Sequence, residues 1–125
     1  MIKCVAAALI SLMALSTPAL AEGNIKAGKK IFKKCKACHD VKEGKNKVGP
    51  SLYNIVGATA GKVEGFKYSK AMAESGLVWD EANLRAFVTK PKELVPGNRM
   101  AFAGLKKEKQ IDDLIAYLNS VSNQE

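Results

Sequence analysis

The chain's one histidine stands directly after a pair of cysteines, in the pentapeptide Cys35-Lys36-Ala37-Cys38-His39. This spacing is typical of a covalent attachment site for a c-type haem. Two thiols three residues apart in a helical turn lie on one side of the backbone, so each can add to a vinyl group of the same porphyrin. His39 can then place a neutral imidazole nitrogen beneath the iron. The motif predicts a fold organised around one haem.

Three other chemistries use a Cys-x-x-Cys pair. A dithiol redox pair expects a βαβ setting, whereas the surrounding pattern here is helical. A structural zinc site needs four ligands, and the chain beyond residue 21 has no further cysteine or histidine. A disulfide between Cys35 and Cys38 would close a very small loop and stabilise little. Haem attachment is therefore the favoured interpretation.

Residues 1–21 have the layout of a secretory signal peptide. Lys3 provides a short basic start, an apolar run extends over residues 5–15, and Ala19-Leu20-Ala21 forms a small-x-small cleavage site. A membrane anchor is the alternative, but the run is well short of the roughly 20 residues that a span requires, and Pro18 follows it closely. We therefore predict cleavage after Ala21 and export to the periplasm.

Cleavage would leave one domain over residues 22–125 with two cysteines, too few for a disulfide framework. Cys4 precedes the apolar run rather than ending it, so we assign it to the discarded segment and not to lipid attachment. Loss of Lys3 takes one unit from the formal net charge of +8. A basic exported protein favours an acidic partner or an anionic membrane, and export makes nucleic acid the least favoured partner.

Helical periodicity dominates the rest of the chain. Asn24 is expected to cap a first helix that runs towards the cysteines. A short helix is expected over Ser69–Ser75, with Gly76 as its stop signal. Asp80 is expected to cap a further helix that Pro91 limits.

The last helix has the clearest pattern. Its apolar positions follow the i, i+3, i+4 rule and comprise Ile111, Leu114, Ile115, Leu118 and Val121, whereas Asp112, Asp113 and Asn119 are expected on the surface. No run of alternating apolar residues is convincing, so the predicted fold class is all-α. Residues 40–66 and 91–105 are expected to be long connections, which in a small domain indicate a function or a missing constraint. A large apolar prosthetic group would organise them.

The sixth position of the iron is either open or filled by another residue type, since His39 has no second histidine to join it. Met72 and Met100 are the methionines left after cleavage. Met72 falls in the expected short helix, where a methionine more often fills the core. Met100 lies in the long connection, where a thioether can reach the iron without distorting a helix. Position therefore favours Met100 over Met72.

Residues 24–122 resemble the class I cytochromes c, of the mitochondrial cytochrome c and bacterial cytochrome c2 type. The matching segments come in the family's order and at its spacing, with Trp79 ahead of the Asp80 helix: AGKKIFKKCKACH, KVGPSLYNIVG, GFKYSKA, VPGNRMAFAGLKK and DDLIAYLNS. The resemblance implies a small single-domain fold of helices and long loops around one covalent haem c. It also implies a monomeric periplasmic one-electron carrier and not an enzyme. A haem enzyme or gas sensor would keep the sixth position open beside a distal acid or base.

The resemblance also implies roles for particular residues. Met100 would be the sixth ligand, and the Pro50 carbonyl would accept a hydrogen bond from the ring of His39. Tyr68 and Trp79 would hydrogen-bond a haem propionate. On the first and last helices, two pairs would pack across each other: Gly28 and Phe32 against Leu114 and Tyr117.

Four departures from the family pattern lie among these segments. Ala58 stands where an arginine near a propionate is common, and Phe87 where a tyrosine is usual. Met72 replaces an asparagine that helps to hold an internal water, and Asn98 replaces the usual threonine after Pro-Gly. Three of these changes remove polar groups from around the haem, so we hypothesise a reduction potential different from that of close relatives.

Lysines gather around the haem motif. A charge run is usually only a solvated face, and that is the interpretation for Lys29 and Lys33. In the family, matching positions ring the exposed haem edge, with Glu93 here interrupting the ring: Lys34, Lys47, Lys92, Arg99, Lys106 and Lys107. The resemblance implies steering onto the acidic surface of a quinol-oxidising complex, terminal oxidase, reaction centre or periplasmic dehydrogenase. Membrane contact would then occur only through such partners.

Overall fold

The computed structural model describes residues 23–122, so the expected signal peptide and its cleavage site lie outside the described residues. These residues form five helices: α1 (Ile25–Phe32), α2 (Lys70–Ala73), α3 (Glu81–Thr89), α4 (Pro91–Leu94) and α5 (Glu108–Ser122). The β structure of this part of the chain is limited to one antiparallel bridge, between Thr59 and Val78. The all-α prediction is confirmed.

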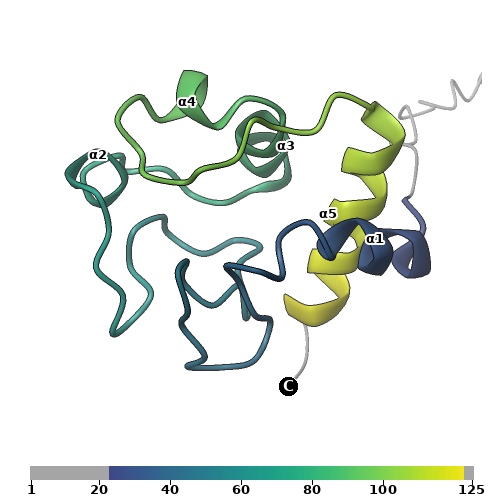
Figure 1. Ribbon diagram of the computed structural model, residues 1–125, viewed down its shortest axis with the longest axis horizontal. Coiled ribbons are helices and arrows are strands. Elements are labelled where there is room, and N and C mark those ends of the chain that lie inside the picture. Colours follow the sequence, from purple (N-terminus) through teal and green to yellow (C-terminus); the bar gives the residue numbers. More distant parts are fainter. Residues whose placement is uncertain (1–22, 123–125) are drawn as a thin grey trace, which may run out of the picture.

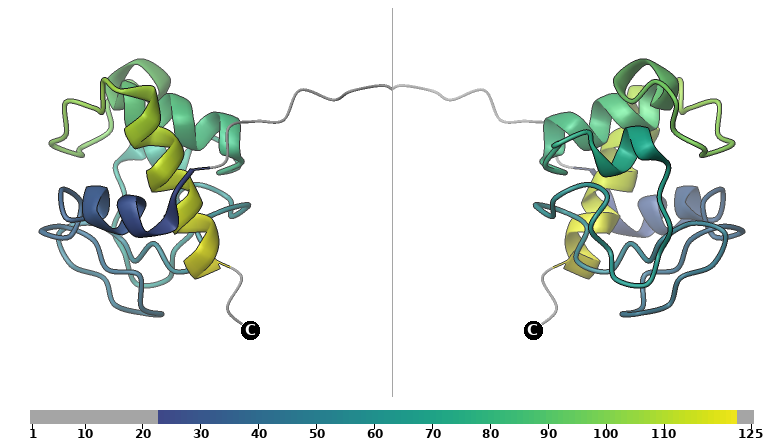
Figure 2. Two further views of the ribbon diagram at one scale, coloured as in Figure 1. Left: turned by 90° about the vertical axis from the view of Figure 1, so that its right-hand side faces the viewer. Right: turned by 90° about the vertical axis from the view of Figure 1, so that its left-hand side faces the viewer.

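α1 packs against α5, and α3 contacts both α4 and α5, while long irregular segments make up much of the rest of the fold. α2, α3 and α4 lie at the top of Figure 1, and the loops over residues 40–60 lie at the bottom. α5 runs along one side from the upper part to the lower part and crosses α1 (Figure 2). Within residues 23–122, no helix is long and apolar enough to cross a bilayer.

The crossing of α1 and α5 depends on a glycine. A Cβ added at Gly28 would lie 1.8 Å from the backbone oxygen of Asp113 and 2.8 Å from the Cβ of Tyr117. One turn further on, the rings of Phe32 and Tyr117 lie 5.4 Å apart at 51°. The predicted packing of Gly28 and Phe32 on the last helix is therefore present, with Gly28 against the backbone of α5.

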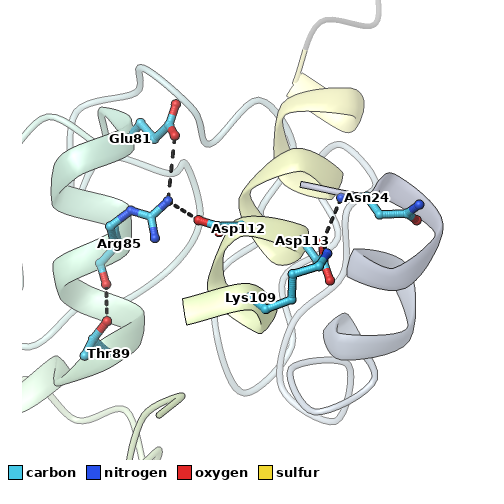
Figure 3. A network of polar contacts seen from close by, with 7 residues as sticks. All are labelled: Asn24, Glu81, Arg85, Thr89, Lys109, Asp112 and Asp113. Carbon is cyan, nitrogen blue, oxygen red and sulfur yellow. Dashed lines mark hydrogen bonds and ion pairs between the residues drawn. The ribbon is translucent and has the colours of Figure 1, made fainter. Parts of the chain in front are cut away.

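The buried face of α5 contains every apolar residue that the periodicity predicted, together with Tyr117. One prediction for this helix was wrong. Asp113, expected on the surface, is 5% exposed. Its Oδ1 accepts hydrogen bonds from the backbone N–H of Asn24 at 2.7 Å and from Nζ of Lys109 at 2.6 Å (Figure 3). Asp113 is buried because the start of α1 supplies a backbone donor that needs a partner.

The predicted caps are confirmed. The side chains of Asn24 and Asp80 accept hydrogen bonds from the N–H groups three residues on, each at 2.8 Å. Ser69 caps α2 in the same way at 3.1 Å. α2 is shorter than predicted, because it ends at Ala73 before the turn at Gly76, whose φ is +66°.

The connection over residues 91–105 is less irregular than predicted, because α4 begins at Pro91. Proline suits the first position of a helix, where its fixed φ is helical and no N–H is needed. Beyond α4 the chain returns to α3. Leu105 donates a backbone hydrogen bond to Val88 at 2.8 Å, and a Cβ added at Gly104 would lie 2.0 Å from the Thr89 oxygen. The 91–105 connection is therefore fixed to α3 at its C-terminal end, in addition to forming α4 at its start.

Candidate functional site

A cavity of about 600 Å³ lies between the helices and the long loops. It is lined by Cys35, Cys38, His39 and Met100, which come from two segments far apart in the sequence. The remaining wall is largely apolar and includes Phe32, Leu52, Ile55, Trp79, Leu84, Phe87, Leu114 and Leu118. A cavity of this volume and character is typical of a cofactor site.

The two cysteines lie on hydrogen-bonded turns that follow α1. Cys35 donates its N–H to Phe32 at 2.8 Å, and His39 donates its N–H to Cys35 at 2.9 Å. This winding brings Cys35, Cys38 and His39 to the cavity together, as the motif predicts. Cys35 and Cys38 are not joined by a disulfide. Burial raises the pKa of the Cys35 thiol, with the Lys34 charge opposing and Cys38 adding to the rise.

The imidazole of His39 is fixed in one orientation. Its Nδ1 lies 2.7 Å from the Pro50 carbonyl oxygen, which is the hydrogen bond that the family resemblance implies. A carbonyl only accepts, so Nδ1 carries the proton. Burial lowers the pKa of His39 below 6.5; the bond to Pro50 opposes this shift, and the Lys47 charge adds to it. The ring is therefore neutral at pH 7, with Nε2 as the nitrogen that can bind a metal.

The loop beneath His39 is held by an asparagine that sequence reasoning did not single out. Asn46 accepts the Ser51 N–H at 2.9 Å and donates to the Glu64 carbonyl at 2.9 Å. It therefore joins the chain around Ser51 to Glu64, 18 residues beyond Asn46. An asparagine in a glycine-containing stretch predicts a turn, but nothing local indicates the distant partner.

Both methionines reach the cavity, so its lining alone does not choose between Met72 and Met100. Their backbones differ. Met72 belongs to α2, where its N–H bonds to Ser69 and its carbonyl to Ser75. Met100 lies in irregular chain, and its N–H bonds to the side chain of Asn98 at 2.9 Å. Asn98 had stood out in the sequence only as a departure from the family pattern.

The aromatic residues implied by the resemblance also line the cavity. The Tyr68 hydroxyl accepts the Val63 N–H at 3.1 Å, so its own proton can be donated elsewhere. Burial raises the pKa of Tyr68 above 10.0. Trp79 is 6% exposed, and its ring lies 4.9 Å from that of Phe87. Ala58 does not line the cavity, but its carbonyl accepts the Trp79 N–H at 2.8 Å.

All six basic residues expected at the partner surface are exposed. Two of them, Lys34 and Arg99, also line the cavity. Arg99 donates from Nη2 to the Lys67 carbonyl at 3.0 Å, so its guanidinium contacts the segment that precedes α2. The cavity lining therefore includes positively charged side chains from two segments far apart in the sequence.

The donor set fits a haem. Two cysteine thiols, a neutral imidazole and a thioether meet at an apolar cavity, and these are the groups that attach a c-type porphyrin and complete its iron. Among the described residues no cluster of three or more His, Cys, Asp or Glu could hold a bare metal ion instead. The fold and the cavity together define a small all-α haem protein.

Comparison with known proteins gives the family. The cytochrome c family model matches residues 25–122. The chain is 50% identical to cytochrome c2 of Agrobacterium tumefaciens, over 78% of this chain and 91% of the relative. It is 48% identical to cytochrome c-550 of Nitrobacter winogradskyi, over 78% and 90%. The solved structure of cytochrome cH from Methylobacterium extorquens superposes with a TM-score of 0.75 at 46% identity, covering 78% of this chain and 99% of that one.

The chain belongs to the cytochrome c family. It is a class I cytochrome c of the cytochrome c2 type, which carries electrons by means of one covalently bound c-type haem and its iron. It is an electron carrier and not an enzyme. The family expectation formed from the sequence is confirmed.

Proposed function

We propose that this protein is a soluble periplasmic one-electron carrier whose haem is attached at Cys35 and Cys38 and ligated by His39 and Met100. The observation that carries the proposal is the meeting of these four side chains at one apolar cavity. The bond from Nδ1 of His39 to Pro50 supports it, since that bond leaves Nε2 as the free ring nitrogen.

When bound, the haem iron supplies a one-electron couple between its ferrous and ferric states. The protein's part is to hold both states in nearly the same geometry. Cys35 and Cys38 fix the porphyrin edge, and His39 is held by Pro50 so that its ring does not turn. The apolar wall excludes water, which limits solvent rearrangement when the charge changes.

Met100 is the proposed sixth ligand in preference to Met72. Met72 is confined because its N–H donates to the Ser69 hydroxyl and its carbonyl accepts from the Ser75 hydroxyl. Met100 lies in irregular chain that can bring its sulfur to the iron. A thioether is a weak donor that favours the reduced state and so raises the potential. With His39 and Met100 both bound to the iron, little would need to rearrange on electron transfer.

Tyr68 and Trp79 are the proposed partners of a haem propionate. Both line the cavity, and the Tyr68 hydroxyl has its proton available because it accepts the bond from Val63. The exposed basic residues would ring the haem edge and steer the protein onto acidic redox partners. We propose that the partners are membrane or periplasmic redox complexes, and that residues 1–21 direct export before removal.

Optical spectra of the purified holoprotein test the axial ligands. The oxidised protein should show a c-type spectrum with the weak sulfur-to-iron charge-transfer band. Met100→Ala should abolish that band, while the matched variant Met72→Ala, which removes the other thioether of the cavity, should keep it. Loss of the band in Met72→Ala alone would assign the sixth position to Met72. A high-spin wild-type spectrum that binds carbon monoxide readily would reject the closed site.

Export has a separate test. The N-terminus of the protein recovered from a periplasmic fraction should be Glu22. Recovery of the chain with Met1 intact in membranes would instead support an anchor.

A further inference from the structure

Asn98 makes three side-chain hydrogen bonds, all to partners within residues 91–100. Its Nδ2 donates to the carbonyl oxygens of Pro91 at 3.0 Å and Val95 at 2.9 Å. Its Oδ1 accepts the backbone N–H of Met100 at 2.9 Å. All the hydrogen-bonding partners are backbone groups, so this side chain joins three points of the main chain.

The orientation of the amide follows from these partners. The partners are two carbonyl oxygens, which accept, and one N–H, which donates. If the amide were rotated by half a turn, its oxygen would face the two carbonyl oxygens and no hydrogen bond could form there. The network therefore matches an asparagine in one orientation. Pro91 is the first residue of α4 and Val95 follows its last, so Asn98 ties Met100 to both ends of that helix.

The segment that contains Met100 has few other attachments. At its far end, Leu105 bonds to Val88 at 2.8 Å, and beside Met100 the exposed Arg99 bonds to the Lys67 carbonyl at 3.0 Å. Among the described residues, the Met100 carbonyl accepts a local hydrogen bond from the Phe102 N–H at 3.0 Å. The bond to Asn98 is thus the link between the Met100 backbone and the helical part of the protein.

We propose that Asn98 is a positioning residue that holds Met100 at the cavity and sets how firmly the sixth position of the iron is closed. The inference rests on the proposed role of Met100 as that ligand. Met100 is held at the cavity through its backbone, so movement of that backbone away from the cavity would break the Asn98 bond to its N–H. The affinity of an external ligand for the iron therefore reports on the Asn98 network.

The usual family residue at this position, threonine, cannot reproduce the network. A hydroxyl has one proton to donate, whereas an amide has two N–H donors and a separate acceptor. Threonine could serve Met100 and one carbonyl at most. This chain therefore holds its Met100 segment with at least one more hydrogen bond than a threonine would allow.

Imidazole titration of the oxidised holoprotein tests the inference, with the sulfur-to-iron band and the imidazole-bound spectrum as readouts. Asn98→Ala removes three hydrogen bonds, each of which shifts an equilibrium by about two- to tenfold. We expect imidazole affinity to rise about tenfold or more. Asn98→Thr should give a smaller rise, and it also decides the question where Asn98→Ala does not yield holoprotein.

Asn24→Ala is the matched control. It removes one asparagine cap bond, from Ala27 on α1, and so lowers stability to unfolding without touching the Met100 segment. Its imidazole affinity should stay within about twofold of wild type. A purely structural Asn98 would behave in the same way, with lower stability and unchanged affinity.

Unchanged imidazole affinity in Asn98→Ala, or in Asn98→Thr if only that variant forms holoprotein, would overturn the inference. Failure of the proposed function gives a different result. If Met100→Ala retained the charge-transfer band, the ligand assignment would be wrong whatever the Asn98 variants did. The two outcomes are therefore separable within one set of proteins.

Discussion

His39 donates from Nδ1 to the Pro50 carbonyl over 2.7 Å, and the backbone of Gly49 lies close against the same ring. A Cβ added at Gly49 would lie 2.4 Å from Cε1 of His39 and 2.7 Å from Nδ1. The imidazole is therefore held by a hydrogen bond and by close contact with a residue that has no side chain. Both constraints act on the ring proposed to bind the iron.

Gly49→Ala should displace this ring, because the added methyl group cannot fit beside it. Overpacking of this kind costs about 1–3 kcal/mol of unfolding free energy. We expect that loss in denaturant titrations of the holoprotein, together with a changed reduction potential. The control is Glu43→Ala in the same loop, where the side chain is exposed and does not line the cavity, so little should change. Equal behaviour of the two variants would remove the steric argument.

Asp113 should make stability depend on pH in acid. Its hydrogen bond from Lys109, and next that from the Asn24 N–H, hold the pKa of Asp113 below 3.8, although burial opposes the shift. A lowered folded-state pKa stabilises the fold at pH values above the unfolded pKa, and this stabilisation is lost as pH falls through the folded value. Wild type should therefore be more stable than Asp113→Asn at pH 7, by about 1–2 kcal/mol. The difference should shrink as pH falls below about 4.

The neighbouring carboxylate provides the control for this experiment. Asp112 pairs with Arg85, which also lies near Glu81, at the partly exposed face between α3 and α5 (Figure 3). Because surface ion pairs contribute little, Asp112→Asn should lower the unfolding free energy by less than about 1 kcal/mol. Urea titrations at a series of pH values measure both variants. An Asp113→Asn difference that does not change between pH 7 and pH 3 would contradict the prediction.

The parts of the fold that the sequence predicted are those with local causes. Asn24 and Asp80 cap the helices that begin at the next residue, through N–H groups three residues on, and the period of α5 places its apolar residues on one face. α4 was missed because its four residues are too few to show a period. Asp113 was misplaced because its partner, the Asn24 N–H, is 89 residues away in the sequence.

The residues of the candidate site also separate into those with local causes, which the sequence predicted, and those with distant partners, which it did not. Cys35, Cys38 and His39 are adjacent in the sequence, so their chemistry could be inferred from spacing. Asn98 holds Met100 through hydrogen bonds to α4, a helix that the sequence did not reveal. Asn46 bonds to a carbonyl 18 residues away. Such contacts depend on how loops meet, which no local pattern encodes.

Removal of a lysine near the cavity should slow electron transfer to an acidic partner. Lys34 is exposed and lines the cavity, whereas Lys26 is exposed on the first turn of α1 and does not. Lys34→Gln should lower the rate severalfold at low ionic strength and weaken its salt dependence, because attraction near the contact surface steers association. Lys26→Gln removes the same charge and should have little effect. Stopped-flow rates at several salt concentrations distinguish them, and rates that barely change with salt would reject steering altogether.

Two substitutions that restore polar groups should shift the reduction potential in opposite directions. Phe87 is 9% exposed and lines the cavity, so Phe87→Tyr places a hydroxyl dipole in the apolar lining of the cavity. A polar group favours the more highly charged oxidised iron, and the potential should fall. Ala58 bonds through its carbonyl to Trp79 of the same wall. Ala58→Arg adds a positive charge beside it, which favours the reduced state and should raise the potential.

A full charge placed near the wall of the cavity should shift the reduction potential by roughly tens of millivolts. Spectroelectrochemical titration of the holoproteins measures these shifts. Ala82→Arg is the matched control, because it adds the same charge at an exposed position of α3, where solvent screens it. Its potential should stay close to that of wild type. If neither Ala58→Arg nor Phe87→Tyr moved the potential, these departures from the family pattern would have no part in tuning the haem.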